Sequence, residues 1–287
     1  MKDLSLARAL LFTPGNRPER FAKAAATRAD GLIIDLEDAV GPADKAGARA
    51  GVIDWLRSHT GFERADFLLC VRMNSVYTSA GLADLLALAD LARDGFAPDV
   101  LLVPKVESAI EIELVARHLR AAGAQGAAIA LAGLIESALG LEHASAIARA
   151  TPMLRTLGFG GADLAADLHC GFAWEPLLSS RSRVVQAAAA AGLAVLDVPY
   201  LDINDDAGLA AESARVKSLG FTGKLAIHPR QVDPIIDAFT PTAAEIENAQ
   251  GVMAAYAAAA GGACVYRGKM VDEPVMRAAR RALARTA

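Results

Sequence analysis

Short apolar runs alternate with longer segments of helical pattern over about 240 residues of the chain. The apolar runs predict strands at 9–13, 31–36, 67–72, 100–103, 127–134, 154–159, 193–198 and 224–227. Helices are predicted from Pro18 and over 44–58, 80–93, 108–122, 178–191 and 206–219. Strands that are apolar on both faces are typical of parallel sheets. Eight strand–helix units are the number in a TIM (β/α)₈ barrel, so the pattern predicts an α/β protein with this barrel over residues 1–240.

An open, doubly wound sheet is the alternative arrangement of such units. Many sheets of that kind bind a dinucleotide through a GxGxxG turn after the first strand. Here the first predicted strand is closed by Pro14-Gly15, and no GxGxxG follows it. The barrel is therefore favoured.

The last part of the chain does not continue the repeat. Residues 242–260 are Ala-rich and predict a helix, since Ala has the highest helix propensity. Gly261-Gly262 then interrupts the pattern, and a last helix is predicted to run to Ala287. We expect residues 241–287 to form a helical tail or lid, hinged at the glycines.

Composition narrows the class of protein. The chain has 287 residues, of which 54% are hydrophobic, and a net charge of −4 without basic runs, so a nucleic-acid partner is not expected. Three widely spaced cysteines, Cys70, Cys170 and Cys264, predict neither a disulfide framework nor a zinc site. No segment approaches the ~18 consecutive apolar residues of a membrane helix, and the apolar N-terminal stretch is too short and interrupted for a signal peptide. We expect a soluble, cytoplasmic protein without a membrane partner.

Polar side chains stand where six of the predicted strands end. In a TIM barrel these ends meet at one face, where the fold places its chemistry. One charged residue at a strand end is ordinary, but six such strands in a chain that is 22% charged indicate a functional rim. The residues are Glu37 and Asp38, Arg72 and Asn74, Lys105 and Glu107, Glu136, Asp163 and His228.

Two carboxylates on this rim are candidate metal ligands. Asp163 follows the sixth strand after Gly160-Gly161, a backbone bare enough for a ligand to come close. Glu136 ends the neighbouring fifth strand, and adjacent strands lie about 4.8 Å apart. Both carboxylates can therefore bind one Mg²⁺, which takes one or two protein carboxylates and completes its octahedron with water and substrate oxygens. The competing interpretations are helix capping by Asp163 and an acid–base pair of carboxylates.

Arg72 is the candidate for holding an anionic or carbonyl oxygen. Its guanidinium offers a planar fork for a carboxylate, a carbonyl or a phosphate. A salt bridge to Glu37 or Glu107 is the alternative, and both roles are compatible. Lys105 and Glu107 lie two apart on one strand and face the same way, so we expect them to pair structurally within the rim.

Eight motifs in order carry a resemblance to a known family. They are LFTPGNRPERFAKA, GLIIDLEDAV, VRMN, VPKVES, IES, LGFGGADLAADL, AIHPRQV and GKMVDEPV, from about residue 8 to 280. The chain resembles the citrate lyase β-subunit-like proteins of the HpcH/HpaI aldolase/citrate lyase family. The resemblance implies a TIM barrel, Mg²⁺ as cofactor and carbon–carbon lyase or condensation chemistry on acyl thioesters, usually of coenzyme A. It also implies a homotrimer or a dimer of trimers.

Residue roles follow from the same resemblance, motif by motif. Glu136 and Asp163 are implied as metal ligands, Arg72 as the group that holds a substrate carboxylate or carbonyl oxygen. Asp272 is implied as a group that the tail contributes, in the relatives over a neighbouring subunit's site. Arg20 and Lys23 resemble positions that meet the coenzyme's phosphates, with solvated helix charges as the alternative.

Four positions depart from patterns in the superfamily. Asp38 and Leu134 stand where the pyruvate-dependent aldolase branch has His and Gln, which favours the thioester lyases. Arg267-Gly268 replaces an acidic Asp-Gly before Lys269, and His169-Cys170 replaces a simpler glycine-containing turn.

Together these features predict a Mg²⁺-dependent lyase that cleaves or forms a citryl-, malyl- or citramalyl-type thioester. Its partners would be an acyl-CoA or acyl-carrier-protein thioester and a 2-oxo acid. Mg²⁺ would act as a Lewis acid, Arg72 would add positive charge, and Asp272 would be the candidate acid or base. The alternatives are a thioester hydrolase, a malate-synthase-like condensing enzyme, and a non-catalytic thioester-binding subunit. The intact Arg72, Glu136, Asp163 and Asp272 argue against the last.

Overall fold

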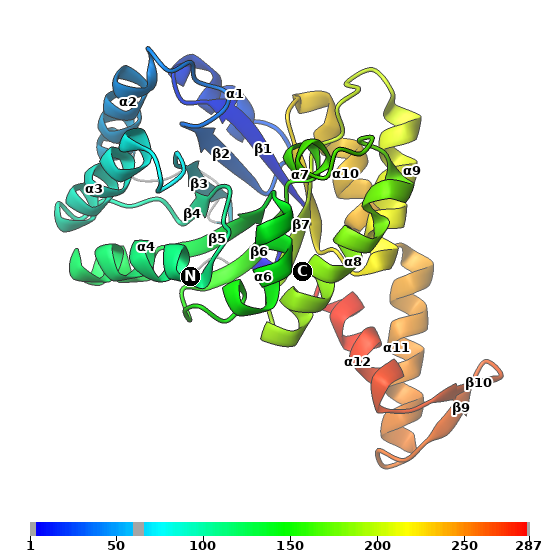
Figure 1. Cartoon of the computed structure of the whole chain (residues 1–287). Helices are drawn as coiled ribbons and strands as arrows, with labels where there is room; N and C mark the ends of the chain where they lie inside the picture. The colour runs from blue at the N-terminus through cyan, green and yellow to red at the C-terminus, as the bar shows by residue number, and fades with distance from the viewer. Residues whose placement is uncertain (1–3, 60–65, 286–287) are drawn as a thin grey trace. The chain divides into compact units, whose positions relative to one another are not determined.

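Eight parallel strands close into a barrel in a computed structural model that describes residues 4–59 and 66–285 (Figure 1). The strands follow one another in chain order, and β8 pairs with β1 to close the sheet. The predicted TIM barrel is therefore confirmed. The strands are β1 (Ala9–Pro14), β2 (Gly31–Asp35), β3 (Leu68–Arg72), β4 (Val100–Val103), β5 (Ala130–Ile135), β6 (Leu154–Phe159), β7 (Ala194–Asp197) and β8 (Gly223–Ala226).

Helices connect the strands and cover the outside of the barrel (Figure 1). Several begin at a side chain that accepts a backbone N–H of the first turn, as Thr78, Ser137 and Asp205 do. The helices are α1 (Phe21–Ala25), α2 (Lys45–Ser58), α3 (Ser79–Arg93), α4 (Ala109–Ala121), α5 (Ala124–Ala128), α6 (Ala138–Ile147), α7 (Gly161–Asp167), α8 (Trp174–Ala191), α9 (Asp206–Leu219) and α10 (Val232–Phe239), with 3₁₀ turns at Leu4–Leu6, Pro18–Arg20 and Pro229–Gln231. In the described ranges, none of these helices has the length and apolar character needed to cross a membrane.

The barrel interior is filled by apolar side chains, which explains why its strands lack alternation. Ile33, Cys70, Leu102, Leu196 and Leu225 belong to one buried cluster at its centre. Nearly all other strand residues are also buried, so the strands are covered on both faces, as in other parallel sheets. The interior is a packed core, and chemistry is confined to its rim.

Two element boundaries in the barrel differ from the sequence prediction by three residues or more. The fifth strand begins at Ala130, because the preceding Ala-rich residues form α5 instead of extending the strand. The helix expected from Leu178 begins at Trp174, one turn earlier. Both errors fall at segment ends, where propensity is a weak guide.

The chain divides into two compact units, one up to Ile236 and one from Asp237 onward. The second unit contains α11 (Ala243–Ala258), the antiparallel strands β9 (Cys264–Tyr266) and β10 (Lys269–Val271), and α12 (Glu273–Leu283). A capping box of Thr242 and Glu245 starts α11. The helices and the hairpin enclose a small core of their own.

The hairpin is absent from the sequence prediction, which placed only a hinge between two helices. Arg267 and Gly268 form its two-residue turn with φ of 49° and 75°, the backbone signs of a type I′ turn. Asn-Gly and Asp-Gly are the sequences that usually indicate such turns, whereas Arg-Gly is not among them. The last helix ends at Leu283, and the predicted continuation reaches residues 286–287, outside the described ones.

Candidate active site

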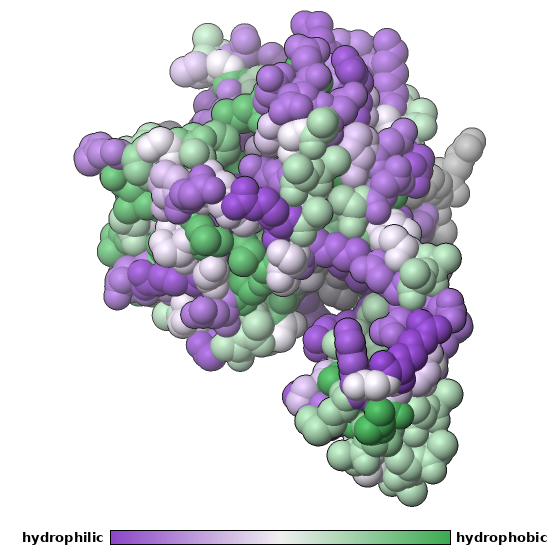
Figure 2. Space-filling model, turned by 90° about the vertical axis from the view of Figure 1, so that its right-hand side faces the viewer, coloured by the Kyte–Doolittle hydropathy of each residue, from purple (hydrophilic) through white to green (hydrophobic). Residues whose placement is uncertain are grey.

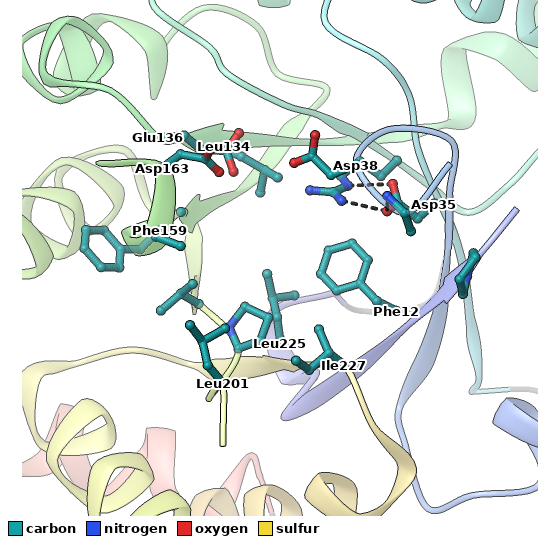
Figure 3. A pocket seen from close by; sticks show the side chains of 17 residues that line it. Phe12, Asp35, Asp38, Leu134, Glu136, Phe159, Asp163, Leu201, Leu225 and Ile227 are labelled. Atoms are coloured by element: carbon teal, nitrogen blue, oxygen red, sulfur yellow. Dashed lines mark hydrogen bonds and ion pairs between the residues drawn. The ribbon is translucent and has the colours of Figure 1, made fainter. Parts of the chain in front are cut away.

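A cavity of about 400 Å³ opens at the carboxyl ends of the strands (Figure 3). Its walls combine four carboxylates and one guanidinium with a larger number of apolar side chains. Three predicted site residues, Arg72, Glu136 and Asp163, meet there. The lining residues are Phe12, Pro14, Asp35, Asp38, Ala39, Arg72, Leu134, Glu136, Phe159, Gly160, Ala162, Asp163, Val198, Pro199, Leu201, Leu225 and Ile227.

Glu136 directly follows β5 and is held rigidly. Its Oε2 accepts the backbone N–H of Lys105 at 2.8 Å, and Lys105 adopts φ of 53°, unusual for a residue with a side chain. Gly160 leaves the space that the carboxylate occupies, because a Cβ on this residue would lie 2.4 Å from Glu136 Oε1. The backbone on two sides therefore fixes this carboxylate, with Oε1 remaining for a ligand.

Asp163 lies in the first turn of α7, an exposed residue beside the buried Glu136 (Figure 3). The N-cap of α7 is Gly160, and no side chain caps this helix end. The capping interpretation of Asp163 is therefore wrong. Its carboxylate is available to a ligand from the cavity.

The charges around Glu136 disfavour its ionisation in the metal-free protein. Burial raises its pKa most, and the neighbouring carboxylates of Glu37 and Asp163 raise it further. The Arg72 charge and the Lys105 N–H act in the opposite direction, and the net effect raises the pKa of Glu136 to about 7. A divalent cation at this point would replace the proton and relieve the repulsion between the carboxylates.

Metal affinity should consequently depend on pH. Since the ion competes with a proton whose pKa is about 7, the affinity for Mg²⁺ should fall roughly tenfold per pH unit below 7 and level off above 8. Calorimetry at pH 6, 7 and 8, in buffers of different ionisation enthalpy, should show proton release that grows as pH falls. Equal affinity at pH 6 and 8 without proton release would contradict this assignment.

Arg72, the last residue of β3, is tied into an ion-pair network. Its Nε and one terminal nitrogen donate to the two carboxylate oxygens of Asp35, each at 2.7 Å. The other terminal nitrogen lies 3.0 Å from Oε2 of Glu37, and Phe12 lies under the guanidinium. The expected salt bridge to Glu37 is present. Asp35 is a partner that the sequence analysis missed, although a buried Asp inside the apolar strand GLIID was a visible signal.

Lys105 joins the same network from the next strand. Its Nζ lies 2.7 Å from Glu37 and 3.2 Å from Asp38, so its side chain pairs with these residues and the expected pairing with Glu107 is wrong. Burial raises the pKa of Glu37, while Arg72 and Lys105 counteract that shift. The roles of Glu37 and Lys105 are therefore to hold Arg72 and Glu136 in place.

The remaining predicted residues lie outside the cavity lining. Arg20, in the turn after β1, and Lys23, in α1, are exposed side chains. His228 caps the 3₁₀ turn after β8 by accepting the Arg230 N–H. Asp272 is the N-cap of α12 in the C-terminal unit, where its Oδ1 accepts the Val275 N–H at 3.4 Å.

The donor set fits a hard, oxygen-loving cation. Across residues 4–59 and 66–285 no group of three His, Cys, Asp or Glu side chains surrounds a metal position. Glu136 and Asp163 instead offer two carboxylates at the edge of an open cavity, a set that suits Mg²⁺ with water and substrate as further ligands. A dedicated all-protein cage, as zinc uses, would need more ligands.

Comparisons with known proteins agree with this geometry. Residues 8–229 match the family model HpcH/HpaI aldolase/citrate lyase. The chain is 35% identical to the L-malyl-CoA/β-methylmalyl-CoA lyase of Cereibacter sphaeroides, over 92% of this chain and 90% of that one. It is 34% identical to citrate lyase subunit beta of Escherichia coli, over 97% and 92%. The crystal structure of CitE from Mycobacterium tuberculosis in complex with magnesium, acetoacetate and coenzyme A matches with a TM-score of 0.80 and 34% identity, over 99% of both chains.

Proposed function

Because this chain belongs to the HpcH/HpaI aldolase/citrate lyase family, we propose that it is a Mg²⁺-dependent carbon–carbon lyase acting on a 3-hydroxyacyl thioester of coenzyme A. Cleavage yields a 2-oxo acid and an acyl thioester, and condensation forms the same bond in reverse. One observation carries the proposal: Glu136 and Asp163 converge on one wall of a cavity that also contains Arg72.

Glu136 and Asp163 are the residues that would hold Mg²⁺. Glu136 would contribute the oxygen that does not accept the Lys105 N–H, and Asp163 would contribute an exposed carboxylate. When bound there, the ion supplies Lewis-acid polarisation to the carboxylate and carbonyl oxygens of the 2-oxo acid. The chain's own part is to keep both carboxylates in position before substrate arrives.

Arg72 supplies fixed positive charge to the reaction. During cleavage a base takes the hydroxyl proton, the electrons of the broken carbon–carbon bond pass to the α carbon of the thioester, and the resulting enolate takes up a proton. Preorganised charge near a developing anion typically contributes ~10²–10³ in rate. Asp35 and Glu37 hold the guanidinium in one orientation, so it need not reorganise during the reaction.

The acid–base residue in this proposal is Asp272 of the C-terminal unit, acting across a subunit boundary of a cytoplasmic homotrimer or dimer of trimers. Such a residue contributes ~10²–10⁴ in rate. Its carboxylate is partly exposed on the N-cap of α12. The apolar side chains of the adjacent hairpin, Val265 and Met270, are 72% and 67% exposed, and Figure 2 displays apolar surface on this unit. Exposed apolar surface of this kind favours contact with another chain.

Arg20 and Lys23, also exposed, are proposed contacts for the coenzyme's phosphates.

Shared sites make a testable prediction. Asp272→Ala and Asp163→Ala chains should each be inactive alone, whereas a mixture of the two, dissociated and reassembled, should regain activity because some sites combine an intact barrel with an intact tail. Wild-type chains taken through the same protocol are the control. A mixture that stays inactive while wild type recovers would assign Asp272 to its own subunit or to no role in the chemistry.

The proposed function is tested by turnover of the purified chain alone. Malyl-, citramalyl- and citryl-CoA should each be assayed with Mg²⁺ and with EDTA, following acyl-CoA and 2-oxo acid together. Equal amounts of the two products, lost in EDTA, are expected. Release of free coenzyme A would indicate a hydrolase. Inactivity on all three would overturn the proposal, and activity on acyl-carrier-protein thioesters alone would indicate a subunit that depends on a carrier protein.

A further inference from the structure

We propose that the cavity selects thioesters whose hydroxyl-bearing carbon carries hydrogen or a short hydrocarbon group, and rejects those with a second carboxylate there. This inference rests on the proposed function and narrows its substrate class. Sequence identity does not distinguish these two classes of substrate, since the relatives named for malyl-CoA and for citrate are 35% and 34% identical to this chain. The distribution of charge around the cavity favours substrates without a second carboxylate.

The cavity is divided into a charged arc and an apolar arc. Residues on or after β2, β3, β5 and β6 supply all of its charged side chains: Asp35 and Asp38, Arg72, Glu136 and Asp163. The strands β7, β8 and β1 lie next to one another in the barrel, between β6 and β2. Their contribution is entirely apolar: Val198, Pro199, Leu201, Leu225, Ile227, Phe12 and Pro14. Figure 3 shows labelled members of this apolar arc, Phe12, Leu225, Ile227 and Leu201, across the cavity from Glu136 and Asp163.

A second carboxylate would find no partner in either arc. The charged arc has four carboxylates and one guanidinium, so a bound Mg²⁺ still leaves it net negative, even before the substrate's own carboxylate enters. Arg72 is the one cation among the described lining residues, and its nitrogens already face Asp35 and Glu37. Lys105, which does not line the cavity, is paired with Glu37 and Asp38. An additional anion would therefore be repelled by the charged arc and would find no polar partner in the apolar arc.

A hydrocarbon substituent, by contrast, matches the apolar arc. Leu201 and Ile227 are 55% and 43% exposed, large apolar side chains left open at the cavity. Leu225 lines the cavity and also belongs to the buried core cluster of the barrel, so this apolar surface rests on packed side chains. A methyl group against this wall buries apolar area at no electrostatic cost.

The test measures kcat/KM for malyl-, citramalyl- and citryl-CoA with Mg²⁺, and calorimetry compares the 2-oxo acid products. The kcat/KM of malyl-CoA or citramalyl-CoA should exceed that of citryl-CoA by about 100-fold or more, a ratio typical of an apolar pocket that meets an added polar group. Glyoxylate or pyruvate should likewise bind the Mg²⁺-loaded protein more tightly than oxaloacetate. Turnover of all three with citryl-CoA equal or preferred would overturn this inference and leave the lyase assignment standing. Failure on all three would instead count against the lyase itself.

A positive charge introduced into the apolar arc should weaken the preference against citryl-CoA. Ile227→Arg adds a cation at a side chain exposed enough to tolerate it, and should raise the ratio of citryl-CoA to citramalyl-CoA turnover at least tenfold. Ile227→Gln, polar and uncharged, is the matched control and should leave the ratio near that of wild type. Leu201→Arg with Leu201→Gln repeats the comparison at a second position. If neither Arg variant raises the ratio above that of its Gln counterpart, the apolar arc does not set the choice and the inference is overturned.

Discussion

Asp163→Asn should abolish turnover while leaving the fold intact. The side chain is exposed and does not cap α7, so its loss should cost little stability. As one of two proposed metal ligands, however, it should be needed both for the affinity of Mg²⁺ and for Lewis-acid catalysis. We expect Mg²⁺ binding in calorimetry to weaken by 10-fold or more, about 1.4 kcal/mol, and turnover to fall to background. Unchanged Mg²⁺ affinity would contradict the assignment of Asp163 as a metal ligand.

Asp167→Asn provides the matched control on the same helix. Asp167 accepts the Ala138 N–H at 2.7 Å, a bond that the amide oxygen of Asn can still accept. It changes the same charge in α7 at a residue that does not line the cavity. Near wild-type turnover and metal affinity are expected. Equal loss of activity in both variants would mean that the substitutions disturb α7, and the loss in Asp163→Asn would then not support a ligand role.

Arg72→Lys should lower kcat/KM by about 10²–10³ although it preserves the charge. A lysine ammonium cannot reproduce the planar fork that bonds both oxygens of Asp35 while facing Glu37. Part of a buried carboxylate pair would be left without donors, so we also expect thermal unfolding at lower temperature, from a loss of roughly 1–3 kcal/mol. Steady-state kinetics and calorimetric unfolding separate the two effects.

Arg49→Lys is the control for this substitution. Arg49 contacts the buried Asp84 through one nitrogen at 3.0 Å, outside the cavity lining, so the change should reduce stability slightly and leave kcat/KM near wild type. An Arg72→Lys enzyme with wild-type kcat/KM and lowered stability would restrict Arg72 to its ion pairs with Asp35 and Glu37.

The eight strands were predictable because each is a short apolar run between helix-forming segments, which the closed barrel requires. The positions of Asp163 and Glu136 at the rim were predictable for a related reason: polar residues directly after buried strands have only the rim to occupy. The pairing of Lys105 with Glu37 was not predictable, because residues 68 apart in sequence meet only once β2, β3 and β4 lie side by side in the sheet. The β9–β10 hairpin was missed because Arg267-Gly268 lacks the residues that usually mark such a turn.

The conformation of Lys105 has a consequence for the timing of metal capture. One residue holds two carboxylates, Glu136 through its backbone N–H and Glu37 through its side chain. Lys105 thus keeps both carboxylates in position, and in the proposed metal site the cation would meet a receptor that is already assembled. The rate of capture should then follow how fast the ion sheds its hydration water, and Mn²⁺, which exchanges water faster than Mg²⁺, should enter the site sooner.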